Sequence, residues 1–520
     1  MEIIDNAAVR LSVNADVAST IITNITNSEL LSKANGKYEV LVNWEHKEAA
    51  ALTRLVGDDL MPSPILRDYN WPGVHIPFDH QRITASFLAL RERGFCFNEA
   101  GTGKTPAVVW AADYLMKLGL VKRVLVVCPV SIMFSAWQAD IFKTAMHRTV
   151  GVAYGAASKR AKIVRGNYEF VIINYDGVGV VRDEIAAAKF DLIVVDEANA
   201  YKNSSTKRWG VLNKLLLPST KLWMLTGTPA AQSPEDAYGL AKLVSPWLVP
   251  KYRTAWKDRV MQQITKFKWV PRVNSEQEVF KALQPAIRYT KDECTDLPDV
   301  LYQTREVPLT PQVAMYYHKL KSQMLIKAAG TVISAVNAAS SMSKLLQISG
   351  GAVYTDEHDV VEFDVSPRLN VLKEVIDETL HKVLIFVPYL HTIEVIRKYL
   401  ESHHCAVGII KGDVSARERA SIINAFQTDA NPRVLIIQPQ SASHGVTLTA
   451  ANVVVFWSPV MSVETYLQCI ARIDRLGQKN KMTVVHLQGS DVERRVYAML
   501  QGKVESHQNL VDLYKLELGV

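Results

Sequence analysis

Short apolar runs alternate with helix-like segments through most of this chain, and no other feature of the sequence constrains the fold as strongly. Runs rich in Val and Ile, separated by helices, are typical of parallel strands that are buried on both faces of a sheet. We therefore predict an α/β fold with two doubly wound parallel-sheet domains. The first series of runs is RVLVVCP (123–129), EFVIINY (169–175), DLIVVDEA (191–198) and KLWMLTGTP (221–229). The second is KVLIFVP (382–388), AVGIIKG (406–412), RVLIIQP (433–439), NVVVFWS (452–458) and MTVVHLQ (482–488).

The segments outside these two series set the expected domain boundaries. A strand at 38–44 and a helix at 46–56 predict a small α+β module at the N-terminus. Thr310 and Pro311 predict the start of a helix, because Thr caps helix N-termini and Pro fits the first turn. The expected divisions are an N-terminal module at 1–74, a first α/β domain at 75–245, a helical insertion or linker at 246–365, a second α/β domain at 366–500 and a C-terminal helix at 501–520.

Composition narrows the class of protein. Hydrophobic residues make up 48% and charged residues 21% of the chain, which is ordinary for a globular protein in water. We expect no membrane span and no signal peptide, because the longest apolar stretch is short and residues 1–11 include acidic side chains. The five cysteines are scattered, which argues against a zinc site or a disulfide framework and fits a reducing cytosol. The 59 basic and 52 acidic residues give a net charge of +7, a mild excess that is compatible with a polyanionic partner.

A glycine-rich stretch, NEAGTGKTP at 98–106, lies between a predicted strand and a predicted helix. In a phosphate-binding loop of this kind, backbone N–H groups surround the phosphates, the Lys104 ammonium neutralises the β- and γ-phosphates, and the Thr105 hydroxyl can bind Mg²⁺. The common pattern G-x-x-x-x-G-K-[ST] has glycine where this chain has Asn98. A GKT triplet alone can arise by chance, but its place between a strand and a helix predicts a nucleotide site.

An acidic pair, Asp196 and Glu197, follows the apolar run at 192–195. Nucleotide hydrolysis needs one carboxylate for the metal and another to orient and deprotonate the attacking water. We predict that Asp196 holds Mg²⁺ and that Glu197 is the base; the alternative is a solvent-exposed acidic turn. The stretch LTGTP (225–229) also ends a predicted strand. This stretch has three possible interpretations: a sensor of the γ-phosphate, a contact to a nucleic-acid backbone, or a tight turn without further function.

Two arginines, Arg472 and Arg475, are spaced so that they share one face of a helix. A planar guanidinium suits a γ-phosphate, and an arginine supplied by a facing domain can stabilise charge during phosphoryl transfer. A solvated basic helix face is the ordinary alternative for two arginines alone. Their neighbours favour the catalytic interpretation, because QCIARIDRLGQ (468–478) completes a motif of a known family.

Taken in order, these motifs resemble those of the Swi/Snf-type ATPases of helicase superfamily two. The phosphate loop is similar to that family's D-E-M-G-x-G-K-T, the acidic pair to its D-E-A-H, and residues 224–246 to its L-T-G-T-P-L-Q-N segment. The arginine motif meets the pattern Q-x-x-x-R-x-x-R-x-G-Q in full. The resemblance covers about residues 78–500. It implies two tandem RecA-like domains, ATP and Mg²⁺ as cofactors, and ATP-driven translocation on double-stranded DNA without wholesale strand separation.

The resemblance also implies roles for individual residues. Gln81, in FDHQ at 78–81, would read the adenine edge, and Gln468 would lie at the nucleotide. Gly101, Thr102 and Gly103 would cradle the phosphates. Contacts to the DNA backbone carry no sequence information, so we expect binding without sequence specificity. The residues implied to make such contacts are Pro129, Thr226, Gly227, Lys411, Gly412 and Thr447.

The compact region between the two α/β domains resembles the fork-remodelling and annealing branch of the family, or its phage and bacterial relatives. The chain departs from the family pattern at four places, none of which removes a group needed for hydrolysis. They are Asn98 in place of Asp, Asn199 in place of the His of D-E-A-H, Ser441, Ala442 and Ser443 in place of A-G-G, and Met461, Ser462 and Val463 in place of W-N-P.

Two further segments have open interpretations. Residues 251–272 combine seven basic residues with one acidic residue and several aromatic ones. They could contact DNA phosphates and stack on bases, or the aromatic residues could form the core of a helical protrusion with solvated lysines. Residues 1–74 could recognise forks or junctions, or act only as a packing cap.

The sequence therefore predicts an ATP-dependent double-stranded-DNA translocase that remodels branched DNA by fork regression, branch migration or annealing. A strand-separating helicase on DNA or RNA is one alternative, and a non-motor adaptor that uses nucleotide as a switch is another. We expect a monomer without membrane contact. Its expected place is the cytoplasm of a bacterial or phage-infected cell, or the nucleus if the host is eukaryotic.

Overall fold

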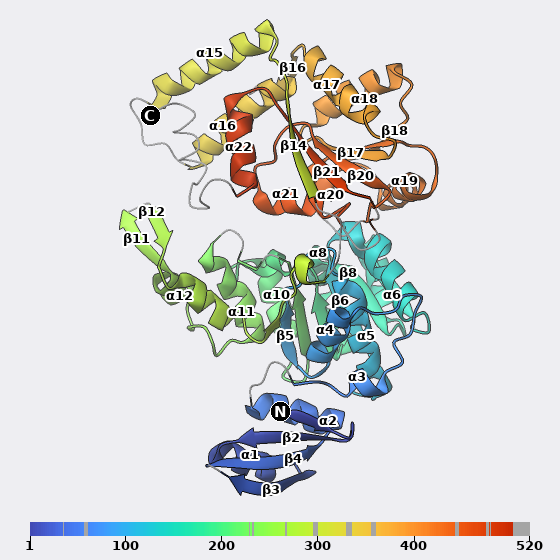
Figure 1. Cartoon of the computed structure of the whole chain (residues 1–520), viewed down its shortest axis with the longest axis vertical. Helices are drawn as coiled ribbons and strands as arrows, with labels where there is room; N and C mark the ends of the chain where they lie inside the picture. Colours follow the sequence, from blue (N-terminus) through green and yellow to red (C-terminus); the bar gives the residue numbers. More distant parts are fainter. Residues whose placement is uncertain are drawn as a thin grey trace. The chain divides into compact units, whose positions relative to one another are not determined.

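The computed structural model divides into two compact units, Met1–Thr295 and Asp296–Val520, and each is described by itself (Figure 1). Of the predicted C-terminal helix at 501–520, residues 503–520 lie outside the described residues. Within the described part of the chain, no helix is long and apolar enough to cross a membrane. The structure describes residues 1–34, 36–56, 61–227, 229–230, 233–265, 268–294, 300–328, 335–354, 360–442, 447–474, 478 and 480–502.

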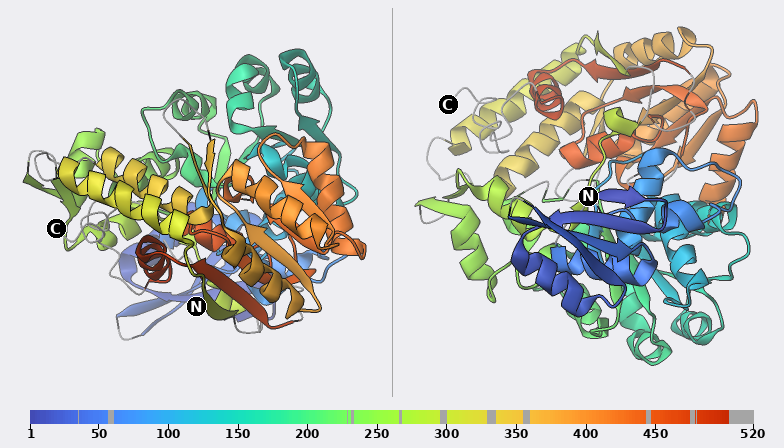
Figure 2. Two further views of the ribbon diagram at one scale, coloured as in Figure 1. Left: turned by 90° about the horizontal axis from the view of Figure 1, so that it is seen from above. Right: turned by 60° about the horizontal axis from the view of Figure 1, so that its bottom comes forward.

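The first unit begins with a four-stranded sheet in the order β1-β2-β4-β3, with antiparallel pairing throughout (Figure 2, blue). Val9 and Val40 on the strands share one apolar cluster with Ile21 and Leu52 on the helices, so both helices cover the same face. The predicted strand at 38–44 and helix at 46–56 are confirmed. The elements are β1 (Glu2–Ile4), β2 (Ala8–Val13), α1 (Ala15–Asn24), β3 (Ser28–Ala34), β4 (Lys37–Asn43) and α2 (His46–Val56).

A seven-stranded parallel sheet follows, in the order β13-β5-β10-β9-β6-β8-β7. Along β6, Leu125 and Val127 belong to one apolar cluster, and Val124 and Val126 belong to another. Because successive side chains of a strand point to opposite faces, both faces are covered, which confirms the doubly wound arrangement. The strands are β5 (Arg93–Cys96), β6 (Val124–Cys128), β7 (Val150–Ala153), β8 (Phe170–Asn174), β9 (Leu192–Val195), β10 (Lys221–Leu225) and β13 (Ala286–Ile287).

Helices connect these strands and extend beyond them. The α-helices of this part are α3 (Ile65–Asp68), α4 (Asp79–Ala89), α5 (Lys104–Lys117), α6 (Ala139–Thr144), α7 (Ala157–Arg165), α8 (Tyr175–Val180), α9 (Arg182–Ala188), α10 (Lys207–Leu215), α11 (Ala237–Val244), α12 (Arg253–Val260), α13 (Ser275–Ala282) and α14 (Lys291–Cys294). A two-stranded antiparallel hairpin, β11 (Met261–Thr265) with β12 (Lys268–Pro271), follows α12.

The second unit contains a six-stranded parallel sheet in the order β14-β21-β20-β17-β19-β18. Along β17, Leu384 and Phe386 join one apolar cluster while Val383 and Ile385 join another, so this sheet is also covered on both faces. The strands are β14 (Val300–Glu306), β17 (Lys382–Phe386), β18 (Val407–Ile410), β19 (Val434–Ile437), β20 (Ala451–Phe456) and β21 (Met482–Gln488). The helices are α15 (Pro311–Ala328), α16 (Ala335–Gly350), α17 (Ser366–Asp377), α18 (Leu390–Ser402), α19 (Ala416–Thr428), α20 (Pro439–Ala442), α21 (Val463–Ile470) and α22 (Asp491–Leu500).

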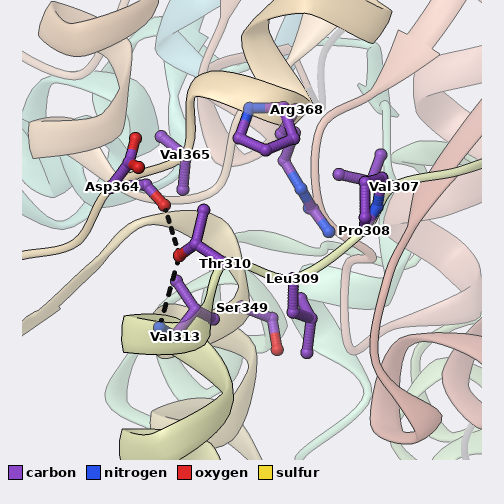
Figure 3. A pocket seen from close by; sticks show the side chains of 10 residues that line it. Val307, Pro308, Leu309, Thr310, Val313, Ser349, Asp364, Val365 and Arg368 are labelled. Carbon is purple, nitrogen blue, oxygen red and sulfur yellow. Dashed lines mark hydrogen bonds between the residues drawn. The ribbon is translucent and has the colours of Figure 1, made fainter.

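Thr310 caps α15 as predicted. Its hydroxyl accepts the Val313 N–H at 3.4 Å and donates to the carbonyl of Asp364 at 3.0 Å, beside a small pocket (Figure 3). Arg368, on the far side of the same pocket, is 1% exposed and donates to Oε2 of Glu493 in α22 at 2.8 Å. The cap marks the start of α15, and the ion pair joins α17 to α22.

The sequence patterns do not predict the edge strands β7, β13 and β14. An edge strand has one neighbour and a partly solvated face, so it needs no continuous apolar run. Exposed and half-buried residues alternate in β14, and this strand lies in a region that the sequence predicted to be mainly helical. The short hairpin of β15 (Ala352–Tyr354) and β16 (Val360–Glu362) was missed for the same reason.

Candidate nucleotide-binding site

The strand order of the first unit brings four loops to one edge of the sheet. β5, β10, β9 and β6 are consecutive neighbours and all run in the same direction. Their carboxyl-terminal loops, which hold the predicted site residues, therefore meet at that edge. A Cβ built on Gly227 would lie 3.4 Å from the backbone nitrogen of Ala100. The loop after β10 thus touches the phosphate loop after β5.

The phosphate loop requires glycine at Gly103. Gly101 and Gly103 have φ angles of 90° and 79°, in the left-handed region that favours glycine. Gly103 caps α5, and a Cβ there would lie 2.0 Å from Nε2 of Gln81. The Thr102 hydroxyl donates to the carbonyl of Glu99 at 2.9 Å and closes the loop on itself. A loop with glycine at two positions, at a helix N-terminus, fits the phosphates of a nucleotide.

Lys104 is the first residue of α5, and its ammonium lies over the loop. Nζ donates to the carbonyls of Asn98 and Glu99 at 2.8 and 3.1 Å. The predicted positive charge is therefore at the loop, and Thr105 is the next residue of the helix.

Gln81 and His80 of α4 both reach the loop. Gln81 is 5% exposed; its Oε1 accepts the Phe78 N–H at 3.0 Å and its Nε2 donates to the carbonyl of Thr102 at 3.2 Å. His80 places Nε2 at 2.8 Å from the same carbonyl. The amide expected to read adenine is bonded to the phosphate loop in this structure. His80 was not predicted, although it stands next to Gln81 in the sequence.

The acidic pair follows β9 and is held by aromatic side chains. Asp196 Oδ2 accepts the indole N–H of Trp137 at 2.9 Å, and Oδ1 accepts the Glu197 N–H at 2.9 Å. The Tyr175 hydroxyl donates to the carbonyl of Asp196 at 2.7 Å, and burial raises the pKa of that hydroxyl. Glu197 has a φ of 49°, a left-handed conformation that costs a non-glycine residue about 1–2 kcal/mol. Strain of this kind is concentrated at functional sites.

The donor set suits a hard divalent cation. The Asp196 carboxylate is fixed in place by these two hydrogen bonds, one at each oxygen. Carboxylate and hydroxyl oxygens are the ligands that Mg²⁺ prefers, with water in the remaining positions. Asp196 and Thr105 therefore fit the predicted metal site. Trp137, which orients Asp196, was missed because only the folded chain brings it to the end of β9.

Two predicted DNA contacts of the first unit lie at the same sheet edge. Pro129 follows β6 and is buried. Thr226 is 1% exposed, and its N–H donates to the carbonyl of Cys96 at 3.1 Å. This hydrogen bond and the contact between Gly227 and the phosphate loop show that the LTGTP turn lies next to the nucleotide site.

In the second unit, Lys411 and Gly412 follow β18. The Lys411 ammonium lies 3.4 Å from the Asp413 carboxylate, and the Gly412 N–H donates to Oε1 of Gln438 at 3.3 Å. Thr447 is exposed. Lys411 and Gly412 therefore lie on a loop at the carboxyl end of a strand, whereas Thr447 precedes β20.

The arginine motif differs from its predicted helical form. α21 ends at Ile470, and the N–H of Arg472 donates to the carbonyl of Cys469 at 3.2 Å in a tighter turn. The prediction that Arg472 and Arg475 share a helix face is wrong for Arg472, because the helix ends before it. Arg472 is 1% exposed, with its Nε donating to the carbonyl of Gln468 at 2.8 Å. Arg475 lies outside the described residues.

The basic stretch 251–272 is partly neutralised within its own unit. Arg253 and Lys257 lie 3.6 and 3.5 Å from the Glu235 carboxylate, and Arg259 pairs with Glu278. Two carboxylates thus serve these three cations, with Arg253 and Lys257 sharing Glu235.

The aromatic residues of the same stretch differ in exposure. Trp256 is fully buried in the core, while Tyr252 is 63% exposed. Trp269 packs against the core and lies under the Lys257 ammonium at 4.2 Å. Trp256 and Trp269 thus agree with the packing interpretation, and Phe267 lies outside the described residues.

Two family descriptions match the chain. The SNF2-related domain matches residues 80–352, and the helicase conserved C-terminal domain matches residues 367–477. The chain belongs to the Swi/Snf (SNF2) family of ATPases. The resemblance and the tandem RecA-like fold that it implied are confirmed.

Relatives of this SNF2-family chain come from phage, bacteria and animals. Protein p41 of Acyrthosiphon pisum secondary endosymbiont phage 1 is 24% identical over 84% of this chain and 97% of its own length. An ATP-dependent helicase of Mycoplasma genitalium is 24% identical over 79% of this chain and 40% of its own length. The Xenopus tropicalis SWI/SNF-related matrix-associated actin-dependent regulator of chromatin subfamily A-like protein 1 is 24% identical over 83% of this chain and 44% of its own. The chain thus spans less than half of the last two proteins.

A solved structure, the Sulfolobus solfataricus SWI2/SNF2 ATPase core in complex with dsDNA, matches 86% of this chain and 96% of that chain, with 23% identity and a TM-score of 0.42.

Two departures from the SNF2 pattern have structural roles in this chain. Asn98 is buried and bonded on both sides of its amide, to Thr84 and to Tyr289. Ser462, in the segment where the family has W-N-P, caps α21 by accepting the Thr465 N–H at 3.3 Å. Ser443 lies outside the described residues.

Proposed function

We propose that this SNF2-family chain is an ATP-dependent translocase on double-stranded DNA that remodels branched DNA. The observation that carries the proposal is the convergence of the phosphate loop, the acidic pair and the LTGTP turn at one edge of the first parallel sheet. In this proposal ATP is hydrolysed at that edge. The LTGTP turn beside the loop is one of the segments that contact the DNA backbone.

In the proposed reaction, water attacks the γ-phosphorus of ATP and the bond to the β–γ bridging oxygen breaks, giving ADP and phosphate. Glu197 accepts the proton of the attacking water, and Lys104 neutralises charge on the β- and γ-phosphates. Gly101, Thr102 and Gly103 cradle the phosphates with backbone N–H groups, and Gln81 contacts the adenine edge. Mg²⁺, held by Thr105 and Asp196, would neutralise further charge on the phosphates.

The second unit supplies the remaining proposed residues. Arg472 and Arg475 stabilise the charge that develops on the γ-phosphate, and Gln468 acts at the nucleotide. Arg472 is buried and bonded to a backbone carbonyl, so its guanidinium would have to exchange that partner for phosphate during the cycle.

DNA is gripped by its backbone in this proposal. Loops at strand ends offer backbone N–H groups, hydroxyls and a lysine, which hold phosphates without reading bases. Stepwise movement follows when nucleotide turnover changes the grip of the two units in alternation. The proposed contacts are Pro129, Thr226, Gly227, Lys411, Gly412 and Thr447.

We also propose that the N-terminal module, 1–74, selects branched DNA. Its ten acidic and six basic residues give a net charge of −4, so selection would use shape or apolar contacts rather than attraction to phosphates. Deletion of residues 1–60 is expected to reduce binding to forked DNA relative to linear duplex. An unchanged ratio of the two affinities would contradict this role.

The experiment that tests the proposed function compares ATP hydrolysis with linear, forked, Holliday-junction and single-stranded DNA and with RNA. We expect double-stranded and branched DNA to stimulate hydrolysis, and Lys104→Ala to abolish hydrolysis while DNA binding stays. Stimulation by RNA or only by single strands would favour a strand-separating helicase. No stimulation by any nucleic acid would favour a nucleotide-switched adaptor. We expect a monomer that works in the cytoplasm of a bacterial or phage-infected cell.

A further inference from the structure

A buried asparagine at the start of the phosphate loop connects three segments of the first unit. Asn98 is 1% exposed. Its Nδ2 donates to the Thr84 hydroxyl at 2.9 Å, and its Oδ1 accepts the Tyr289 N–H at 3.0 Å. The Thr84 hydroxyl donates in turn to the carbonyl of His80 at 2.7 Å. One side-chain amide therefore joins α4, the phosphate loop and the segment that follows β13.

The segment after β13 runs alongside the loop and then leaves the first unit. The N–H groups of Phe97 and Glu99 donate to the carbonyls of Ile287 and Tyr289 at 2.8 and 3.0 Å. The Lys291 N–H donates to the Glu99 carboxylate at 3.1 Å. The second unit begins at Asp296. The chain thus passes the phosphate loop immediately before it enters the second unit.

Lys104 links nucleotide occupancy to the same two residues. Its ammonium donates to the backbone carbonyls of Asn98 and Glu99. A triphosphate in the loop competes for this ammonium, because bonds between a cation and a phosphate are stronger than bonds to a neutral carbonyl. Binding would take a donor away from the carbonyls of both residues whose side chains hold the segment at 289–291.

The amide at 98 suits this connection better than the family's carboxylate does. An amide donates and accepts at once, whereas an ionised carboxylate only accepts. With aspartate, the Thr84 hydroxyl would have to turn away from the His80 carbonyl to donate to residue 98. The side chain would also bury a negative charge beside the phosphate loop, which is unfavourable without a partner.

We propose that Asn98 is a positioning residue that transmits nucleotide occupancy of the phosphate loop to the segment leading into the second unit. This inference rests on the proposed function, because it needs a nucleotide in the loop. It goes beyond that function by assigning the route of coupling to one buried amide and its two partners.

The test is hydrogen exchange of the full chain, followed by mass spectrometry of peptides covering 286–294, with and without a non-hydrolysable ATP analogue. In the wild type we expect the analogue to change exchange in these peptides. In Asn98→Ala and Thr84→Val that change should fall by at least about fivefold, the effect of losing one hydrogen bond, because each variant removes two of the bonds described above. The Kd of the analogue should change by a much smaller factor than the exchange response does. In DNA-stimulated hydrolysis, kcat should fall by a larger factor than the factor by which KM changes.

Two matched variants separate coupling from general damage. Thr84→Ser keeps the hydroxyl and should restore the wild-type exchange response. Ser245→Ala removes another buried hydrogen bond, from the hydroxyl to the carbonyl of Ala282 at 3.0 Å, and should leave the response unchanged. If Asn98→Ala does not fold, Thr84→Val and its serine rescue decide the question.

A wild-type response in both Asn98→Ala and Thr84→Val would overturn the assignment of Asn98. Failure of DNA translocation alone would leave the exchange response intact while duplex DNA fails to stimulate hydrolysis, whereas failure of the nucleotide site would leave the wild type unable to bind the ATP analogue at all. That result would overturn both proposals together.

Discussion

At the scale of single residues, Glu197 combines a strained backbone with a place at the end of a buried strand. Its N–H donates to the Asp196 carboxylate and its φ is 49°. Neighbouring groups therefore hold the residue in a left-handed backbone conformation that is unfavourable for glutamate. We predict that Glu197→Gln lowers kcat by about 10²–10⁴-fold, the usual contribution of a general base. Binding of an ATP analogue should be retained, because the amide has the same shape. Steady-state hydrolysis and equilibrium binding measure the two effects, and wild-type turnover would contradict the assignment.

His46 of α2 makes folding of the first unit sensitive to pH. Burial, helped by the nearby Lys221 charge, lowers the pKa of its imidazole to about 4. Its ring packs edge-on against the ring of Tyr114, with 5.6 Å between the two ring centroids. Between pH 6.5 and 4 the unfolded chain binds a proton at His46 that the folded chain does not, so stability falls as the pH drops through that range.

The variant His46→Phe removes this proton linkage and keeps an aromatic ring. We expect the free energy of unfolding of the wild type to drop by about 2 kcal/mol more than that of the variant between pH 7.5 and 5. Urea unfolding at the two pH values measures the difference. Equal losses in both proteins would show that another group controls the response.

Motifs in the sequence were enough to single out Lys104, Thr105, Asp196 and Glu197, and the structure places them after β5 and β9 at one edge of the sheet. The roles of His80, Trp137 and Asn98 were not predictable, because each depends on a hydrogen bond between segments that only the folded sheet brings together. Arg472 illustrates a different limit. Three-residue spacing predicted a helix face, but the helix ends two residues earlier and the side chain is buried.

At the scale of elements, the β5–loop–α5 unit contains a glycine at which any side chain would meet the amide of Gln81. A methyl group on Gly103 would lie 2.0 Å from Gln81 Nε2, whereas one on Gly119 would meet nothing within 4 Å. Both glycines have positive φ angles, 79° and 72°. Backbone strain, about 1–2 kcal/mol, is therefore common to Gly103→Ala and Gly119→Ala, and only the first adds a clash at the phosphate loop.

We predict that Gly103→Ala loses at least about 1.4 kcal/mol of binding free energy for an ATP analogue, a tenfold change in Kd. Gly119→Ala should bind like the wild type and show only the shared loss of stability. Calorimetric titration and thermal unfolding of the two variants measure these effects. Equal affinities would mean that the loop accepts a side chain and that its glycine has no special role.

Arg368 of α17 and Glu493 of α22 form a buried ion pair in the second unit, with side chains 1% and 0% exposed. Glu493 also accepts the N–H groups of Gly489 and Ser490 at 2.8 and 3.0 Å. Removing one charge leaves the other buried without its partner, which typically costs 3–5 kcal/mol.

Arg368→Met should therefore destabilise the second unit by about 3–5 kcal/mol. The double variant Arg368→Met with Glu493→Leu should recover part of that loss, because no unpaired charge remains. Denaturant unfolding of the three proteins checks the order. A double variant less stable than Arg368→Met would contradict a net desolvation penalty.

Continuous apolar runs predicted the central strands of both sheets, because a strand buried on two faces needs apolar side chains at every position. The edge strands β7, β13 and β14 gave no such signal, whereas the edge strand β18 was predicted from its apolar run at 406–412. β14 alternates exposed and half-buried residues, and β13 spans only Ala286 and Ile287. Yet β13 leads into the segment that pairs with the phosphate loop, so a strand absent from the sequence prediction carries part of the proposed coupling.

At the scale of the whole molecule, the chain contains two doubly wound parallel sheets and matches both domains of an SNF2-family ATPase. A nucleotide switch needs only one such domain. A motor requires a second parallel-sheet domain with its own loops at strand ends, because movement along DNA needs two domains that bind and release the DNA in alternation. The first unit carries the phosphate loop and the acidic pair, and the second carries the arginine motif.

Displacement of a triplex-forming strand from duplex DNA tests the central claim most directly. The wild type with ATP should displace the third strand and leave the underlying duplex paired, whereas Glu197→Gln should leave the third strand bound. Rapid ATP hydrolysis without displacement, or separation of the duplex strands at the same rate, would contradict translocation on double-stranded DNA.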